Sequence, residues 1–385
     1  MRTFFVVHRP VPTEPCGGGG GVNYRLMMAQ KRYHHFENAY FIYSDILISA
    51  NTGERLRLLQ DEHQFDINKT KEIYSVLNTH FRFNDEDVFV FQDIHSFYAM
   101  RETIGDMKRS IVVYHQQGSM YYEGLAHGLS PDKDRKEQLD YLTRYAIENS
   151  SIFAFPSYGG KQALIDTLPD AALWLNKKKT IILYNGCSPS VTPEVDSDEQ
   201  SIMDFLERIQ GDIFISVAVL NEAKGVERLP DFFKRYDKIH FGKDWMWVIV
   251  GSGVKADSLS EGIKGLEGHI LWIQEHIPND LILRMYEKAD FYIMAHRYSI
   301  FDFATIEAMH MGCIPVLSDV GGNREMLGYG NGYMLDDDLN SDLFCEWVRK
   351  KDIQQMKDIN RNVAREIFSE QSMLKRYLDA VSSMY

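Results

Sequence analysis

Residues 290–325 of the chain read DFYIMAHRYSIFDFATIEAMHMGCIPVLSDVGGNRE. An apolar run at 290–294 is followed by a loop, by an apolar stretch that ends at Gly312, and by a second short apolar run at 314–317. Both runs show little alternation between apolar and polar residues, as do strands that are buried on both faces. The stretch therefore predicts a strand, loop, helix and strand of a parallel α/β sheet.

The same alternation of short apolar runs and helical patterns extends over the whole chain. Further strands are expected at 3–7, 39–43, 87–91, 110–114, 151–155, 180–184, 213–219, 246–250, 270–273 and 332–335. Helical patterns separate them, for example at 22–33, 69–79 and 133–149, and residues 352–385 predict two amphipathic helices.

The length of 385 residues exceeds the usual size of a single hydrophobic core and indicates two domains. Turn residues at 185–190, followed by an acidic segment at 195–199, have the composition of an interdomain linker. We place the boundary near residue 188, with an N-terminal Rossmann-like domain at 1–188 and a C-terminal one at 189–385. The final helix could pack back on the first domain. Ligands bind beyond the carboxyl ends of parallel strands, so we expect one cleft between two sheets that face each other.

Composition excludes several classes of protein. The net charge is −13, from 42 Lys and Arg against 55 Asp and Glu, and this acidic balance argues against a nucleic-acid partner. No segment approaches the roughly 20 apolar residues of a membrane span, so a soluble, intracellular protein is expected. The four cysteines have no metal-ligand spacing and are expected to be reduced thiols: Cys16, Cys187, Cys313 and Cys345.

Glycine-rich turns provide the first candidate binding residues. The run 17–21, which includes Gly19 and Gly20, directly precedes a helical pattern, so its backbone could approach an anion at the helix N-terminus. A mobile surface loop explains five glycines equally well. Gly251 and Gly253 follow a predicted strand in the same manner, but the third glycine of a dinucleotide fingerprint is missing.

Two side chains at strand ends are further candidates. His115 follows the strand predicted at 110–114, where it could face a ligand, although a lone histidine is more often structural and His95 has a similar position. Lys224 precedes a glycine and a helical pattern after the strand predicted at 213–219, where its charge could meet a phosphate.

Over nearly its whole length the chain resembles the retaining GT-B glycosyltransferases of glycosyltransferase family 4, with specific motifs in the second half and only generic ones in the first. That family has a donor site with a Glu-x7-Glu loop and helix, an Ala-Met-x-x-Gly-x-Pro-Val segment and a Gly-Gly-x-x-Glu turn. Lys224-Gly225 matches its phosphate-binding lysine and Asn185-Gly186 its interdomain turn. The other matching residues are Glu307-Ala308-Met309, Gly312, Pro315-Val316, Gly321-Gly322 and Glu325.

This resemblance implies a GT-B fold and the transfer of a hexose or N-acetylhexosamine, most often from a UDP-sugar, in bacterial-type polysaccharide or glycoconjugate synthesis. Glu307 would hold the donor ribose, Lys224 the diphosphate, and His115 would lie beside the transferred sugar. The glycine turns and the amides of Ile300, Phe301 and Asp302 would also contact the donor. No obligatory cofactor or metal is implied, and Asp-x-Asp sequences such as Asp85/Asp87 are interpreted as exposed turns. The acceptor would be a glycan, a lipid-linked glycan or a protein, in the cytoplasm and with room for peripheral contact at the inner membrane face.

Three positions depart from the family pattern. Ser299 stands where the family has the first glutamate, Val219 where it has an arginine, and Asp302 where it prefers glycine. Asp302 would repel a diphosphate, with Arg297 and Arg324 as the nearest compensating charges in sequence. Alternatively, Ser299 and Asp302 form a capping box for the following helix, or they contact sugar hydroxyls. The competing hypotheses are an inactive glycosyltransferase-like subunit that stabilises a partner or recognises its acceptor, and another GT-B activity such as epimerisation or hydrolysis.

Overall fold

A computed structural model describes residues 2–12, 18–44, 46–52, 54–57, 67–126, 130–190, 197–240 and 244–385. The chain divides into two compact units, the first comprising Met1–Asn185 and Glu370–Tyr385 and the second Gly186–Ser369. The division falls after Asn185, close to residue 188, where the turn composition placed the boundary. The second unit begins and ends at one place, because the amide of Cys187 donates to the carbonyl of Phe368 at 2.9 Å.

The first unit is built on a sheet with the strand order β4-β3-β2-β1-β5-β6-β7-β8 within the described residues. The strands from β2 to β8 in this order run parallel, and β3 pairs antiparallel with both β2 and β4. Strand bounds are β1 (Thr3–Val6), β2 (Ala39–Ile42), β3 (Ile46–Ser49), β4 (Arg55–Arg57), β5 (Val88–Phe91), β6 (Ser110–Val113), β7 (Ile152–Phe155) and β8 (Thr180–Ile182).

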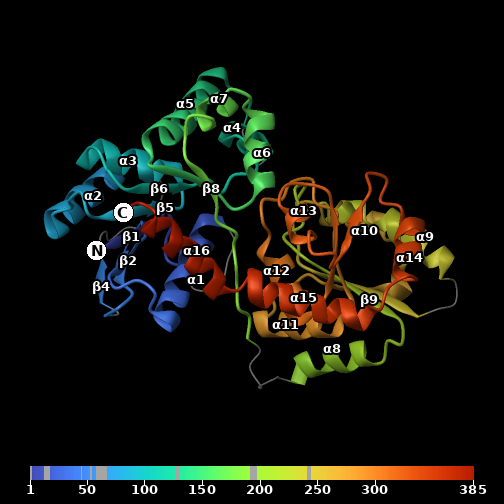
Figure 1. The fold of residues 1–385 in the computed structure, drawn as a ribbon. Helices are drawn as coiled ribbons and strands as arrows, with labels where there is room; N and C mark the ends of the chain where they lie inside the picture. The colour runs from blue at the N-terminus through green and yellow to red at the C-terminus, as the bar shows by residue number, and fades with distance from the viewer. Residues whose placement is uncertain are drawn as a thin grey trace. The chain divides into compact units, whose positions relative to one another are not determined.

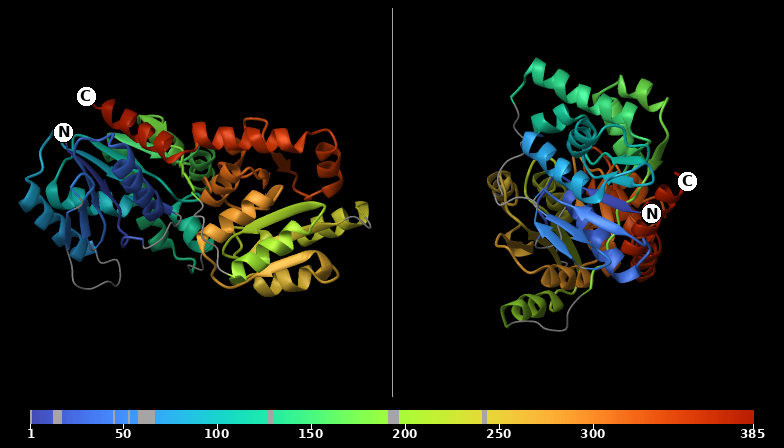
Figure 2. Two further views of the ribbon diagram at one scale, coloured as in Figure 1. Left: turned by 90° about the horizontal axis from the view of Figure 1, so that it is seen from below. Right: turned by 90° about the vertical axis from the view of Figure 1, so that its left-hand side faces the viewer.

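The C-terminal helix α16 (Glu370–Ser382) packs against α1 (Gly18–Tyr33) of the first unit (Figures 1 and 2). Tyr377 of α16 is fully buried, and its hydroxyl donates to Oε1 of Gln92 at 3.4 Å. The remaining helices of this unit are α2 (Ile67–Phe81), α3 (Ile94–Ile104), α4 (Met120–Ala126), α5 (Lys133–Asn149), α6 (Tyr158–Thr167) and α7 (Ala171–Leu175).

The second unit contains a parallel sheet in the order β11-β10-β9-β12-β13-β14. Strands β10 and β11 lie on one side of β9. The chain then crosses to the other side, where β12, β13 and β14 follow in order. The strands are β9 (Asp212–Val217), β10 (Trp245–Val250), β11 (Ile270–Ile273), β12 (Phe291–Met294), β13 (Ile314–Ser318) and β14 (Tyr333–Leu335).

Helices cover both faces of this second sheet (Figure 1). One layer contains α8 (Ser197–Glu207), α11 (Asn279–Lys288), α12 (Phe303–Met311) and α15 (Ile353–Ile367), and the other α9 (Pro230–Ile239), α10 (Ala256–Gly262) and α14 (Ser341–Val348). The short helix α13 (Asn323–Met326) follows β13, and single 3₁₀ turns occupy Val226–Arg228 and Glu267–His269.

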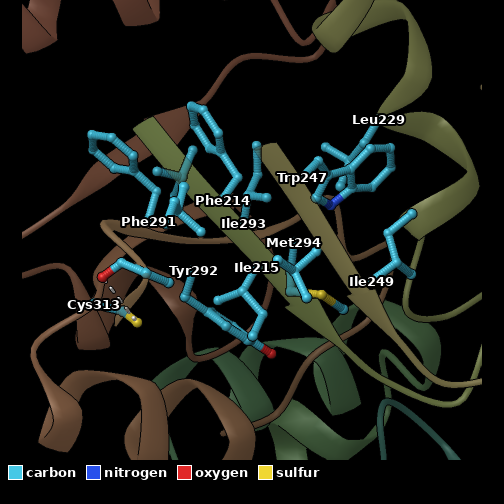
Figure 3. Close-up of a cluster of buried hydrophobic side chains, with 14 of the residues drawn as sticks. Phe214, Ile215, Leu229, Trp247, Ile249, Phe291, Tyr292, Ile293, Met294 and Cys313 are labelled. Atoms are coloured by element: carbon cyan, nitrogen blue, oxygen red, sulfur yellow. Dashed lines mark hydrogen bonds between the residues drawn. The ribbon is translucent and has the colours of Figure 1, made fainter. Parts of the chain in front are cut away.

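The core explains why these strands lack alternation. Figure 3 shows Phe214 and Phe291 on one face of the sheet, and Ile215 and Tyr292 on the other. All four side chains are fully buried, and the Phe214 and Phe291 rings stack at 5.0 Å between centroids. A strand with both faces covered places apolar residues at every position, so the sequence reads as a continuous apolar run.

Several expectations about local structure need correction. The hairpin of β3 and β4 was not predicted, and α1 begins inside the glycine run, at Gly18. Asp87 does not lie in an exposed turn: it is 3% exposed and accepts from Nε and Nη2 of Arg2 at 2.8 and 2.7 Å. Cys187, Cys313 and Cys345 are buried and form no disulfide with another described residue, whereas Cys16 and Gly17 lie outside the described residues. Within the described residues, no helix has the length and hydrophobicity that a membrane crossing requires.

Candidate functional site

The candidate residues of the second unit gather at the carboxyl ends of β9 and β12. These neighbouring strands flank the point where the strand order reverses, which is where open parallel sheets bind ligands. The loop after β12 is tied to the loop after β9, because the amides of Arg297 and Tyr298 donate to the carbonyl of Ala223 at 2.9 and 3.3 Å. Two loops that are far apart in sequence therefore form one edge.

An ion pair joins these loops. The ammonium Nζ of Lys224 lies 2.6 Å from Oδ1 of Asp302, and the two side chains are 27% and 13% exposed. Lys224 is also held at its backbone, since its amide donates to Oδ1 of Asn221 at 3.1 Å. The charge that offsets Asp302 is therefore the proposed phosphate lysine itself.

Asp302 has a second structural role at the start of α12. Its Oδ2 accepts from the amide and from the hydroxyl of Thr305, both at 3.2 Å, and from the hydroxyl of Tyr292 at 3.3 Å. Burial opposes ionisation of Asp302, yet the neighbouring charge of Lys224 and these donors hold the pKa of the carboxyl well below its usual range. The helix cap is thus Asp302, and the hydroxyl of Ser299 takes no part in it.

The two arginines that are the nearest compensating charges in sequence, Arg297 and Arg324, are paired elsewhere. Nη1 of Arg297 contacts the carboxylate of the nearly buried Glu227 and donates to the carbonyl of Glu222 at 2.9 Å. Arg324 is largely exposed and forms an ion pair with Asp319, with 3.0 Å between Nε and Oδ1. Neither has a hydrogen bond or ion pair with Asp302 in the part of the chain that the structure describes.

Glycines allow the backbone of this edge to pack closely. A side chain on Gly225, at φ +65°, would place its Cβ 1.9 Å from the carbonyl oxygen of Ala295. The φ of Gly321 is +51°, and a Cβ there would lie 1.4 Å from the carbonyl oxygen of Ser299. Gly251 and Gly253 approach the loop after β9 in the same way, since a Cβ on either would lie 2.0 or 2.4 Å from a carbonyl oxygen of that loop. These glycines are required by packing within the unit, whatever they contact in a ligand.

Glu307 lies on α12, one turn and a residue beyond its cap, and is half-buried. Burial first, and then charges that include Glu307, raise the pKa of Tyr286 and Tyr292 well above its usual range. Both phenols are fully buried in the apolar core of the second unit. Phe301 is buried, with its ring 5.3 Å from that of Phe368, so its side chain is part of the packing.

On the segments after β12 and β13, three polar groups are buried and have no hydrogen-bond partner among the described residues. They are Nε2 of His296, Oγ of Ser299 and Oδ1 of Asn323. Ser299 was a candidate, but His296 and Asn323 were missed. The signal was present for His296, which lies two residues after β12 just as His115 lies two residues after β6.

The first unit has a separate set of candidates at the carboxyl ends of β1, β5 and β6. Nε2 of His115 donates to Oε1 of Gln92 at 2.8 Å, and burial lowers the pKa of His115 to about 4, so the ring is neutral at pH 7. A Cβ on Gly19 would lie 2.6 Å from the carbonyl oxygen of Gln92, and one on Gly20 would lie 3.5 Å from Cβ of Arg9. The start of α1 thus packs directly on the end of β5.

The segment that carries the ion pair is similar to a known protein family. Residues 199–351 match the model of the family glycosyl transferases, group 1. The matched segment includes Lys224, Asp302, Glu307 and the glycine turns at 251–253 and 321–322. No curated protein matches the sequence of the chain.

Solved structures extend the likeness to the whole chain. The chain is similar to sucrose-phosphate synthase from Thermosynechococcus elongatus, with TM-score 0.70, 14% identity, and 100% of this chain and 99% of that chain covered. It is similar to a glycosyltransferase from Rickettsia africae at TM-score 0.68 and 13% identity, with 100% and 98% covered. Anabaena HepE, solved in complex with UDP-glucose, gives TM-score 0.65 and 14% identity, with both chains fully covered.

These likenesses establish the fold. The chain has the two-domain GT-B fold, and the family match together with this fold supports a glycosyltransferase. Within the described residues, no three His, Cys, Asp or Glu side chains gather in a way that could hold a metal ion.

Proposed function

We propose that the protein transfers a hexose or N-acetylhexosamine from a nucleoside-diphosphate sugar to a glycan, glycolipid or protein-linked acceptor, with retention at the anomeric carbon. The observation that carries this proposal is the position of Lys224, at the end of β9 beside the start of α12, inside the matched glycosyl transferase domain. A helix N-terminus and a lysine together favour a diphosphate. The UDP-glucose bound to HepE supports a uridine donor.

Each candidate residue then has a role in the proposed reaction. Lys224 and the amides at 300–302 would stabilise the departing nucleoside diphosphate, whose charge grows as the glycosidic bond breaks. Glu307 would accept hydrogen bonds from the ribose diol, and the neutral His115 would lie beside the sugar. No metal or other cofactor has a part in this proposal. Surface polysaccharide or glycoconjugate synthesis, in the cytoplasm and at the inner membrane face, is the context we propose.

A specific observation favours a second candidate function. Lys224 is already paired with Asp302, so a diphosphate must compete with an ion pair of 2.6 Å. A site in which this pair persists would not bind the donor, and the protein would be a glycosyltransferase-like subunit that stabilises a partner or recognises its acceptor.

A thermal-shift titration with UDP, GDP, TDP, ADP and CMP, with and without magnesium, tests the proposal. A ligand at 100 times its dissociation constant stabilises the folded protein by ~2.7 kcal/mol. We expect one diphosphate to bind selectively without magnesium, and Lys224→Ala and Glu307→Ala to abolish turnover while the protein remains folded. If none of the five nucleotides raises the melting temperature, the proposal is overturned in favour of the binding subunit.

A further inference from the structure

Three of the polar groups that have no hydrogen-bond partner among the described residues lie together on the segments after β12 and β13, and all three are buried. His296 and Asn323 are 0% exposed and Ser299 is 8% exposed. A buried polar atom without a hydrogen bond costs about 1–3 kcal/mol of stability, so such groups are rare unless a ligand or water satisfies them. Other buried groups of this unit also have no partner among the described residues, but these three are set apart by lying on neighbouring segments at the carboxyl edge of the sheet.

These loops are joined by hydrogen bonds. Nδ2 of Asn323 donates to the carbonyl of Ser318 at 2.9 Å and lies 3.4 Å from Nδ1 of His296. The hydroxyl of Ser318 donates to the carbonyl of His296 at 2.6 Å, and the amide of Gly322 donates to the carbonyl of Ser299 at 3.2 Å. The loop after β12 and the loop after β13 therefore form one rigid edge that carries all three groups.

The chemistry of the three groups is that of a site for hydroxyls. Because Nδ1 of His296 accepts from Asn323, the ring hydrogen lies on Nε2, which can donate. Ser299 can donate and accept, and Oδ1 of Asn323 can only accept. Burial and the charge of Lys224 lower the pKa of His296 to about 3, so the imidazole is neutral at pH 7. Sugar hydroxyls both donate and accept, and they pair with such a set without leaving a charge buried.

Nearby charges add a preference among sugars. Lys224 and Asp302 are the charged groups that act on His296, and they are paired with each other. A diphosphate that draws Lys224 away would leave the carboxylate of Asp302 facing the rest of the donor. That carboxylate would accept from a hydroxyl and would repel a second carboxylate.

We propose that His296 Nε2 and Ser299 Oγ, with His296 fixed by Asn323, bind the hydroxyls of an uncharged sugar on the donor, and that hexuronate donors are excluded. This inference rests on the proposed function, and it assigns to His296 and Asn323 a part in sugar specificity.

Histidine offers matched variants for the test. His296→Asn places an amide oxygen near the position of Nδ1, so the contact with Asn323 is kept and the Nε2 group is lost. His296→Gln places an amide nitrogen near the position of Nε2 and serves as the rescue. Ser299→Ala removes a buried hydroxyl that has no partner among the described residues, so we expect its thermal stability to be unchanged or raised.

The measurement is the dissociation constant of UDP, GDP, TDP and ADP, and of their derivatives with glucose, galactose, mannose, N-acetylglucosamine and glucuronic acid, by isothermal titration calorimetry with the full-length chain. In the wild type, the nucleotide derivative of one neutral sugar should bind more tightly than the corresponding nucleoside diphosphate alone. The glucuronic acid derivative should bind no more tightly than that diphosphate. His296→Asn and Ser299→Ala should each reduce this gain about tenfold, the effect of one hydrogen bond, and His296→Gln should restore part of it. Affinity for the diphosphate itself should not change.

The other outcomes are also decisive. If diphosphates bind but the sugar gain is absent, or is equal in wild type and variants, the groups are satisfied by water and the inference is wrong, while the proposed function stands. Tighter binding of the glucuronic acid derivative would also overturn it. If no diphosphate binds, the proposed function itself fails.

Discussion

Asp302 holds two partners at once, the first turn of α12 through Oδ2 and the ammonium of Lys224 through Oδ1. The cap explains why an acidic residue is tolerated where the resembled family prefers glycine. A diphosphate that binds Lys224 must first break this ion pair, and this lowers its affinity. Under the proposed function, one carboxylate therefore links the stability of α12 to the affinity for the donor.

Replacing Asp302 by Asn separates these two effects. Asparagine caps helices about as well as aspartate, so we expect a loss of about 1 kcal/mol or less, from the broken ion pair. Lys224 becomes free and a negative charge disappears, so the affinity for the nucleoside diphosphate should rise about tenfold or more. Isothermal titration calorimetry measures the change, with Glu261→Gln as a control that removes an exposed charge in the same unit. A weaker affinity would mean that Asp302 itself contacts the ligand.

At the scale of elements, the loop before α12 is held from outside by the glycine turn after β13. Gly321 and Gly330 both have positive φ, at +51° and +68°, but only Gly321 lacks space for a side chain. Gly321→Ala should destabilise the second unit by about 3 kcal/mol, because it adds a clash with Ser299 to the backbone strain. Gly330→Ala carries the strain alone and should cost about 1 kcal/mol. Urea unfolding distinguishes them, and equal losses would show that packing against Ser299 is unimportant.

The elements that the sequence predicted well are the buried parallel strands and the amphipathic helices. β11 (Ile270–Ile273) and α5 (Lys133–Asn149) agree in both bounds, because the strand is a short continuous apolar run and the helix has a long helical pattern. The hairpin of β3 and β4 was missed because a helix was expected after each strand. The turn residues Asn51, Thr52 and Gly53 between its two runs were the available signal.

The candidate site was predictable in its position but not in its pairings. Strand ends marked Lys224 and the loop at 297–302, since ligands bind at the carboxyl edge of a parallel sheet. The contact between Lys224 and Asp302 spans 78 positions, and the two arginines considered as compensating charges, Arg297 and Arg324, instead pair with other carboxylates. These ion pairs depend on which side chains come together after the two loops have packed, so local sequence patterns do not predict them.

At the scale of the whole molecule, buried neutral histidines make stability depend on pH. Burial lowers the pKa of His296 to about 3 and that of His310 to about 4, against about 6.5 in an unfolded chain. Between pH 6.5 and 4 the unfolded state binds more protons, so the free energy of unfolding falls as the pH falls. Asp302, with its lowered pKa, loses its contribution only below about pH 4 and is constant in this window.

We expect each of these two histidines to lower the stability of the second unit by about 2 kcal/mol between pH 7 and pH 5. Urea unfolding followed by tryptophan fluorescence measures this, because Trp245 and Trp247 lie in the core of that unit. In the double variant with His296→Asn and His310→Asn, the free energy of unfolding should depend much less on pH. Equal stability of the wild type at the two pH values would contradict the prediction.

The backbone hydrogen bond between Cys187 and Phe368 closes the second unit at its base, where Gly186 also lies against Ser369. The chain leaves the first unit at Asn185 and returns to it at Glu370, so the intervening 186–369 is an inserted cassette whose two ends are neighbours. Recombination at these two junctions would replace the whole second unit and leave the connectivity of the first unit unchanged. Under the proposed function, such an exchange would change the donor specificity while the N-terminal sheet and α16 stayed the same.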